Sequence, residues 1–280
     1  MPESPEVQAL ADFIGERAAG RTIAEADVLE FRVVKTRAQP PNVLIGAEVT
    51  GAQRFGKHLD LAVGGRHLGV ALGRHGWARW TDPGATVQSG ADLPPALASL
   101  TLDDGSVLEF TDAGSWVSLG LSVVDDPRDV PAVAKLGPDP ADPSFAQDDL
   151  DAVLIGRRKQ LKAVLQEQES IAGIGNAYSD EILHLAKLSP IVQASALTAD
   201  ERERLFAATT GIIRDAIAAR RGIPIDQLKA AKVASMRVHG RAGEACPVCG
   251  DEIRDLAFAS TTAQYCPTCQ TAGFVIGGDA

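Results

Sequence analysis

Residues 246–269 read CPVCGDEIRDLAFASTTAQYCPTC and contain all four cysteines of the 280-residue chain. Their spacing is Cys-x2-Cys-x16-Cys-x2-Cys, and a proline follows the first cysteine of each pair. Two such pairs on tight turns are typical of a zinc ribbon, in which four thiolates complete a tetrahedral site. One structural zinc ion is therefore expected, with no open coordination position, on Cys246, Cys249, Cys266 and Cys269. Two disulfides are the alternative, which a reducing compartment disfavours.

The residues before this module have a helical pattern. Apolar spacing and cap residues predict helices over 144–155, 158–166, 179–188 and 198–221. The last of these has Thr198 as N-cap, Glu201 at the capping-box position and Gly222 as its stop. The sequence therefore predicts a helical domain next to the zinc ribbon.

Between two of these helices lies the turn Ile171-Ala172-Gly173-Ile174-Gly175-Asn176. A Gly-x-Gly turn before a helix presents backbone N–H groups at the helix N-terminus, which suits a phosphate. Asn176 adds a side-chain donor. The alternative is a turn that only connects two helices.

The N-terminal half has a β pattern after one leading helix. Residues 8–19 have helical apolar spacing and end at Gly20. Short β-branched runs predict strands over 22–29, 43–53, 58–63, 66–72, 99–102, 107–111 and 116–124. Asp104-Gly105 marks a hairpin. A β-sandwich or barrel of about eight strands is expected, followed by a Pro/Asp-rich linker.

The chain begins Met1-Pro2-Glu3-Ser4-Pro5-Glu6. After removal of Met1, Pro2 would present a secondary amine, whose reference pKa of about 7.7–8.0 leaves much of it neutral and nucleophilic near neutral pH. Such an amine can form an iminium with a sugar aldehyde carbon, while Glu3 moves protons and Glu6 positions the attack. With Met1 retained, Pro2 would be a tertiary amide without a nucleophilic nitrogen. The alternative is an ordinary acidic N-terminus in which Met-Pro only favours processing.

Composition narrows the class of protein. The chain is 45% hydrophobic and 23% charged, contains no run of 18 apolar residues and lacks a secretory signal, so a cytosolic globular protein is expected. The net charge is −10, and residues 1–150 carry 12 Lys and Arg against 22 Asp and Glu. This balance argues against strong non-specific attraction to a polyanion. The window 229–241 is locally basic, although a solvated helix face is the preferred explanation on these residues alone.

Four motifs occur along the chain in an order that points to a known family. They are Pro2-Glu3 with Pro5-Glu6, Arg54-Phe55-Gly56-Lys57, Gly173-Ile174-Gly175-Asn176-Ala177-Tyr178 with Glu181, and the terminal zinc ribbon. Together they resemble the formamidopyrimidine-DNA glycosylase / endonuclease VIII family over nearly the whole chain. The resemblance implies an α+β multidomain protein that combines a β-sandwich bearing a leading helix, a helix–two-turn–helix domain and a zinc-ribbon hairpin. The implied boundaries are 1–124, a linker at 125–143, 144–240 and 241–280.

The resemblance also implies a DNA-repair enzyme, a DNA glycosylase with β/δ-elimination lyase activity on abasic sites. Its partner would be double-stranded DNA that contains oxidised bases or abasic sites. The protein would be a monomer and would not associate with a membrane. Pro2 would attack C1′ and Glu3 would protonate the sugar oxygen, with Glu6 in support. Lys57 would grip one phosphate, and Asn176 with the neighbouring amides another. Tyr178 and Glu181 would serve packing and turn structure.

Three positions depart from the family pattern. Thr261 stands where an Arg of the finger usually contacts a phosphate, and a hydroxyl has neither charge nor bidentate reach. Arg74 follows Leu72-Gly73 where Met is common, and it would pair with a base edge or cap a hairpin. Trp116 would wedge into the duplex in place of a Phe, or lie in the core as a strand residue.

Two other functions stay open on the sequence alone. A damaged-DNA-binding protein of the same fold, without base excision or with only the abasic-site lyase activity, would suit the missing finger Arg and the net acidity. A zinc-ribbon interaction protein without DNA affinity is the third possibility. Covalent trapping separates the first two, and the salt dependence of DNA binding tests the third.

Overall fold

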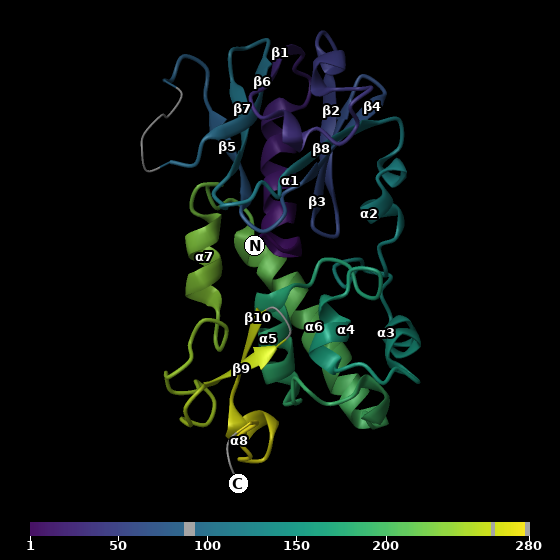
Figure 1. Cartoon of the computed structure of the whole chain (residues 1–280), viewed down its shortest axis with the longest axis vertical. Coiled ribbons are helices and arrows are strands. Elements are labelled where there is room, and N and C mark those ends of the chain that lie inside the picture. Colours follow the sequence, from purple (N-terminus) through teal and green to yellow (C-terminus); the bar gives the residue numbers. More distant parts are fainter. Residues whose placement is uncertain (87–92, 259–260, 278–280) are drawn as a thin grey trace. The chain divides into compact units, whose positions relative to one another are not determined.

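A computed structural model describes residues 1–86, 93–258 and 261–277 (Figure 1). The chain forms two compact units, Met1–Lys135 with Arg220–Lys229, and Leu136–Ala219 with Ala230–Ala280. The first change of unit falls inside the segment expected to be a linker, which itself contains short helices at Pro127–Asp129 and Pro131–Ala134. Among the described residues, no helix is both long and apolar enough to cross a membrane.

The first unit contains α1 (Ser4–Ala18) and two four-stranded antiparallel sheets. One sheet has the order β1-β6-β7-β5, with strands at Ile23–Val28, Ala96–Leu102, Val107–Asp112 and Gly76–Thr81. The other has the order β2-β3-β4-β8, with strands at Val49–Phe55, His58–Val63, Arg66–Ala71 and Gly120–Val124. Short 3-10 turns lie at Phe31–Val33 and Pro41–Leu44.

One hydrophobic core joins the two sheets and the helix. Alternate residues of β3 and β4 point into it, as the buried Leu59 and Leu61 on one strand and Leu68 and Val70 on the next illustrate. Helix α1 packs on β2, where an added Cβ on Gly15 would lie 3.6 Å from the backbone nitrogen of Ala52. The predicted β-sandwich with a leading helix is confirmed.

The segment 220–229 belongs to the first unit although it follows the long helix of the second. Its Ile225 and Leu228 are buried in the first core, and the indole of Trp77 donates a hydrogen bond to the carbonyl of Ile225 at 3.0 Å. This contact links residues that lie 148 positions apart in the chain. Local sequence patterns do not carry such information.

The second unit is helical with a terminal strand pair. Its helices are α3 (Gln147–Leu154), α4 (Leu161–Gln166), α5 (Asn176–Ala186), α6 (Ala199–Arg220) and α7 (Leu228–Ser235), of which the last two reach into the first unit. A short 3-10 turn lies at Ala194–Ala196. Strands β9 (Arg254–Phe258) and β10 (Thr261–Tyr265) pair antiparallel and lead to α8 (Pro267–Gln270).

Several element predictions are confirmed and others are wrong. The hairpin at Asp104-Gly105 joins β6 to β7, and the reciprocal Thr198–Glu201 cap precedes α6. Strand β5 was not predicted. The strand expected from residue 116 begins only at Gly120, because Asp112 holds the preceding residues in a hydrogen-bonded loop. The helix expected from residue 144 begins at Gln147, since the Ser144 hydroxyl bonds Asp142 instead.

Candidate functional site

The N-terminal residues lie at the start of α1. Pro2, Glu3 and Glu6 are buried, and the backbone N–H of Glu3 donates to Glu6 Oε2 at 3.1 Å. Glu6 Oε1 lies 3.7 Å from Arg220 Nε, and both of these side chains are at most 3% exposed. Glu6 therefore connects the first helical turn to the buried guanidinium of Arg220. Through its bond to the Glu3 N–H, it also fixes the backbone of Glu3, the residue after Pro2. The role of Arg220 escaped the sequence analysis because nothing local distinguishes it from its neighbour Arg221.

Lys57 lies in the two-residue turn between β2 and β3. Gly56 has φ of 54°, the left-handed conformation that such hairpin turns need, and Phe55 pairs with His58 across the turn. The guanidinium of Arg54 donates to the carbonyl of Gly56 at 2.9 Å and to Gln8 of α1 at 3.1 Å. Arg54 thus ties the Lys57 turn to the helix that begins beside Pro2 and Glu3.

Trp116 is 84% exposed, in the loop before β8. Trp116 is therefore not a core residue of a strand, and that alternative is wrong. Asp112 holds the loop: its carboxylate accepts from the backbone N–H groups of Gly114, Ser118 and Leu119 at 2.8, 2.8 and 3.0 Å, and from the Ser118 hydroxyl at 2.9 Å. Burial alone would raise the pKa of Asp112, but these hydrogen bonds outweigh it and lower the pKa below its usual value.

Arg74 lies in the neighbouring turn between β4 and β5. Its backbone N–H donates to the Ser118 hydroxyl at 3.1 Å, and Gly73 has φ of 59°. A Cβ on Gly73 would come within 2.6 Å of the Ser118 backbone oxygen, so only glycine fits this close approach. The turn that carries Arg74 and the loop that carries Trp116 are therefore bound together.

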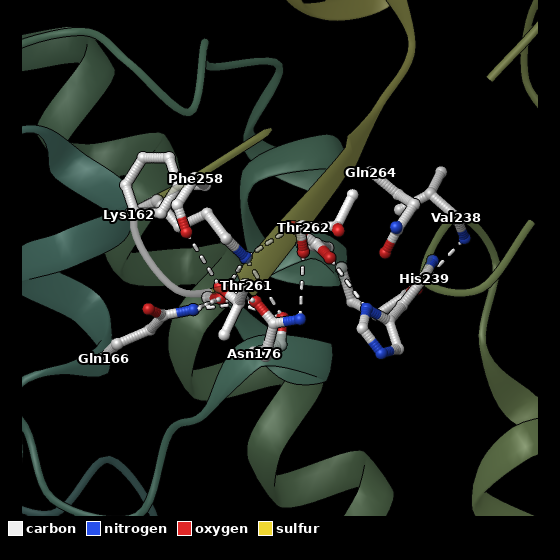
Figure 2. Close-up of polar contacts among 12 residues, drawn as sticks. Lys162, Gln166, Asn176, Val238, His239, Phe258, Thr261, Thr262 and Gln264 are labelled. Atoms are coloured by element: carbon white, nitrogen blue, oxygen red, sulfur yellow. Dashed lines mark hydrogen bonds and ion pairs between the residues drawn. The ribbon is translucent and has the colours of Figure 1, made fainter. Parts of the chain in front are cut away.

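In the second unit, Asn176 begins α5 directly after the Gly173–Gly175 turn. Its Oδ1 accepts from Gln166 Nε2 at 3.0 Å, and its Nδ2 donates to the carbonyl of Thr262 on β10 at 3.0 Å (Figure 2). The Thr261 hydroxyl lies 3.5 Å from Asn176 Oδ1 and 3.1 Å from the carbonyl of Phe258. The structure thus brings together two predicted site residues, Asn176 and Thr261, and adds Gln166.

A buried charge network, which the sequence analysis did not identify, lies beside Asn176. Lys162 is fully buried, and its Nζ donates to Asp180 Oδ1 at 2.6 Å, to the Ser179 hydroxyl at 2.8 Å and to the carbonyl of Asn176 at 3.2 Å. Asp180 Oδ2 lies 2.7 Å from Nδ1 of His239. A lysine in the apolar run of α4 was the only available signal, and its partners come from distant segments.

Glu181 and Tyr178 contact the backbone and the hydrophobic core of the second unit, respectively. Glu181 is buried and accepts three backbone N–H groups, from Arg237, Val238 and His239, at 2.9 to 3.0 Å. Burial raises its pKa, against the lowering effect of these bonds. Tyr178 is buried in the helical core. Glu181 thereby fastens the segment after α7 to α5.

The four cysteines form a metal site. Their sulfur atoms all lie within 4.8 Å of one another, with Cys246 and Cys269 at 3.9 Å and Cys249 and Cys266 at 3.4 Å. A tetrahedral zinc with Zn–S bonds of about 2.3 Å requires S···S separations of about 3.8 Å, so the set fits one zinc ion. Burial raises the pKa of the Cys269 thiol to about 11, which disfavours the thiolate form. A bound cation stabilises the thiolate and offsets this effect. Residues 259–260 and 278–280 of the predicted 241–280 finger lie outside the described residues.

A histidine of α5 lies against this site. His184 is buried, and its Nε2 is 3.2 Å from the sulfur of Cys246. Burial lowers the pKa of His184, with the positive charge of Arg237 acting in the same direction, so the imidazole is neutral near pH 7. A neutral imidazole can donate its N–H to a thiolate, which orients and stabilises the ligand.

Each unit holds its own set of candidate residues. The first unit contains Pro2, Glu3, Glu6, Lys57, Arg74 and Trp116. The second unit contains Asn176, Thr261 and the four cysteines. The first unit thus carries a candidate nucleophile with acids and a lysine, and the second carries candidate amide donors beside the zinc ribbon. Each group is of a kind that can contact a phosphate-containing substrate.

Family models match three consecutive parts of the chain. Residues 1–116 match the formamidopyrimidine-DNA glycosylase N-terminal domain, residues 136–226 match the formamidopyrimidine-DNA glycosylase H2TH domain, and residues 243–272 match a zinc finger found in FPG and IleRS. Formamidopyrimidine-DNA glycosylase of Mycobacterium avium (strain 104) is 35% identical over 289 residues, which cover 96% of this chain and 98% of the relative.

Solved structures are similar in fold as well. MutM in complex with DNA that contains carbocyclic 8-oxo-G has a TM-score of 0.84 at 26% identity, covering 96% of this chain and 100% of that one. Fpg of Lactococcus lactis in complex with DNA that contains an abasic site has a TM-score of 0.85 at 25% identity, covering 96% and 99%. The predicted fold is confirmed over nearly the whole chain.

Proposed function

Because the chain belongs to the formamidopyrimidine-DNA glycosylase family, a family of DNA repair glycosylases with a structural zinc finger, we propose that it excises oxidised bases from double-stranded DNA and then cleaves the abasic strand. The observation that carries the proposal is the placement of Pro2 and Glu3 at the start of α1, where Glu6 and Arg220 hold the first turn. The protein acts as a monomer on DNA in the cytosol.

The reaction begins at Pro2 once Met1 is removed. The Pro2 nitrogen attacks C1′ of the damaged nucleotide, the bond from C1′ to the base breaks, and the base leaves with a proton. Glu3 gives a proton to the ring oxygen of the sugar, which opens the ring and leaves an iminium between Pro2 and C1′. Loss of a C2′ proton then eliminates the 3′ phosphate, and a second elimination releases the 5′ phosphate. Water finally hydrolyses the iminium.

Two groups position the DNA backbone in this proposal. Lys57 holds one phosphate from a turn that Arg54 fixes to α1, and the Asn176 amide holds another from the start of α5. Trp116 and Arg74, on two loops that are bound to each other, enter the duplex and fill the space left by the extruded nucleotide. The high exposure of Trp116 supports this role.

The substitution at Thr261 favours a second candidate function. Without a guanidinium at this point of the finger, binding of an intact damaged nucleotide loses a charged contact, worth on the order of 2 kcal/mol. An abasic site needs less of that binding energy, because its base is already absent. The second candidate is therefore a lyase restricted to abasic sites, or a damage-binding protein.

One comparison of substrates tests the proposal. The Met1-free protein is incubated with two kinds of matched duplex, one that contains an oxidised base (8-oxoguanine, formamidopyrimidine or an oxidised pyrimidine, each in turn) and one that contains an abasic site. The proposal predicts free damaged base and strand cleavage from the first and strand cleavage from the second. Cleavage of the abasic duplex alone would leave the lyase-only candidate, and binding without cleavage of either would leave the binding protein.

A further inference from the structure

The side-chain amide of Asn176 is held from two sides by groups of opposite hydrogen-bonding character. Its oxygen faces a donor, Gln166 Nε2, at 3.0 Å, and its nitrogen faces an acceptor, the Thr262 carbonyl, at 3.0 Å (Figure 2). A carboxamide nitrogen carries two protons, so one bond to Thr262 leaves the second proton for another acceptor. Turning the amide by 180° would set oxygen against oxygen and N–H against N–H, and both contacts would be repulsive.

The Gln166 side chain is itself well anchored. It ends α4, and its Nε2 also lies 3.3 Å from the Ser179 hydroxyl on the first turn of α5. Its backbone carbonyl accepts from Gln168 Nε2 at 2.9 Å, while Gln168 Oε1 accepts from the N–H of Gly173 at 2.9 Å. Gln166 is therefore fixed to the same Gly173–Gly175 turn that places Asn176.

We propose that Gln166 is a positioning residue that sets the orientation of the Asn176 amide, so that its nitrogen and not its oxygen faces a DNA phosphate. This inference rests on the proposed function, in which Asn176 contacts the phosphate. An amide presented the other way would direct an oxygen lone pair at an anion.

Thr261 makes this orientation more important. A hydroxyl has one proton, and the carbonyl of Phe258 at 3.1 Å is a closer acceptor for it than Asn176 Oδ1 at 3.5 Å. The finger therefore supplies no charged donor at position 261, and the neutral donor on Asn176 takes a larger share of phosphate binding. Its strength depends on Gln166.

The experiment measures the Kd for a duplex with a tetrahydrofuran abasic-site analogue, by fluorescence anisotropy at fixed salt. Gln166→Leu removes the donor and is expected to weaken binding about fivefold, as for loss of one neutral hydrogen bond. Gln166→Glu replaces the donor with a charged acceptor that attracts the Asn176 nitrogen away from the DNA, and about tenfold weakening is expected. Gln147→Leu on α3 is the matched control, because the hydrogen bond that Gln147 donates is local, to Asp151 one helical turn away, and its Kd should match the parent protein.

A double-mutant cycle separates positioning from a general structural effect. In an Asn176→Ala background, Gln166→Leu should change Kd less than twofold, because the amide that it orients is gone. Equal weakening by Gln166→Leu in both backgrounds would overturn the inference, since Gln166 would then act through something other than Asn176. Zinc content and the unfolding midpoint of each variant confirm that it is folded.

The cycle also separates this inference from the proposed function. Weaker binding by Asn176→Ala with an unchanged Kd for Gln166→Leu would overturn the inference and keep the phosphate contact. An unchanged Kd for Asn176→Ala would remove the phosphate contact itself, and the inference would fall with it. The Asn176 side-chain NH2 resonance provides an independent readout: it should shift on binding the duplex in the parent protein and lose that shift in Gln166→Glu.

Discussion

At the scale of single residues, the buried pair of Glu6 and Arg220 decides how firmly the N-terminal turn is held. Removing one partner of a buried ion pair leaves the other charge uncompensated, which costs about 3–5 kcal/mol. Arg220→Ala is therefore expected to lower the free energy of unfolding by about 3 kcal/mol in chemical denaturation. Arg17→Ala is the control, because the exposed Arg17–Asp82 pair at 2.7 Å should contribute under about 1 kcal/mol. Equal effects of the two variants would contradict this account.

Asp112 gives a pH prediction at the same scale. Its pKa is lowered in the folded loop, so its hydrogen bonds stabilise the loop fully above the unfolded pKa of about 3.9 and are lost as pH falls through the folded value. The amide resonances of Gly114, Ser118 and Leu119 should therefore stay constant from pH 7 to about pH 4 and change only below it. A transition with its midpoint above pH 4 would show that the carboxylate does not hold the Trp116 loop.

Thr261 allows a gain-of-function test. Thr261→Arg restores a charged donor on the finger and should tighten binding to an abasic-site duplex about tenfold, in line with about 1.5–3 kcal/mol for charged hydrogen bonds. The slope of log K against log salt should become steeper by about 0.9, as one more phosphate is neutralised. Thr50→Arg, at an exposed position of β2, makes the same change of charge in the first unit and should leave that slope nearly unchanged. A tighter complex with both variants would indicate net charge, and not the position of the Arg, as the cause.

At the scale of elements, α5 and the zinc ribbon support each other through His184 and Cys246. Removing a group that orients a metal ligand typically costs 10–100-fold in metal affinity. His184→Ala should therefore release zinc to a chromogenic chelator at a concentration at least about tenfold lower than the parent protein requires. His75→Ala, on an exposed turn of the first unit, is the control. Unchanged zinc retention in His184→Ala would mean that the 3.2 Å contact has no role in metal binding.

The elements that the sequence predicts well are those with local signals. The Thr198–Glu201 cap and the Asp104-Gly105 hairpin each depend on residues a few positions apart, and both are present in the structure. Strand β5 escaped prediction because its pairing partner, β7, follows about 30 residues later in the chain and supplies the contacts that define it. Trp80 of β5 pairs with Leu108 there, a partner that no local pattern indicates.

The same division holds for the site. The cysteine spacing is a short motif, so the metal site could be predicted, whereas the helix expected from residue 179 begins three residues earlier, at Asn176. The buried charge of Lys162, by contrast, is paired with Asp180, which also contacts His239, 77 residues from Lys162 in the chain. Arg220 likewise depends on Glu6, which lies 214 positions earlier in the chain. Roles that depend on such distant partners require the folded structure.

At the scale of the whole molecule, the chain builds one unit around the candidate nucleophile and another around the zinc ribbon and the amide donors. The return of residues 220–229 to the first unit, fixed by the bond from Trp77 to Ile225, brings Arg220 to Glu6. All of the acidic excess lies in residues 1–150, whereas residues 151–280 carry 15 basic and 15 acidic groups. Affinity for DNA is therefore expected to depend on particular contacts more than on overall charge.

The central claim is that the Pro2 nitrogen forms the covalent bond to the sugar. It is tested most directly by borohydride trapping on a duplex with one abasic site, using protein shown by mass spectrometry to lack Met1. The account predicts a covalent adduct that mass spectrometry of the digested complex places on the Pro2 nitrogen. An adduct on a lysine side chain, or no adduct from Met1-free protein that binds the DNA, would contradict it.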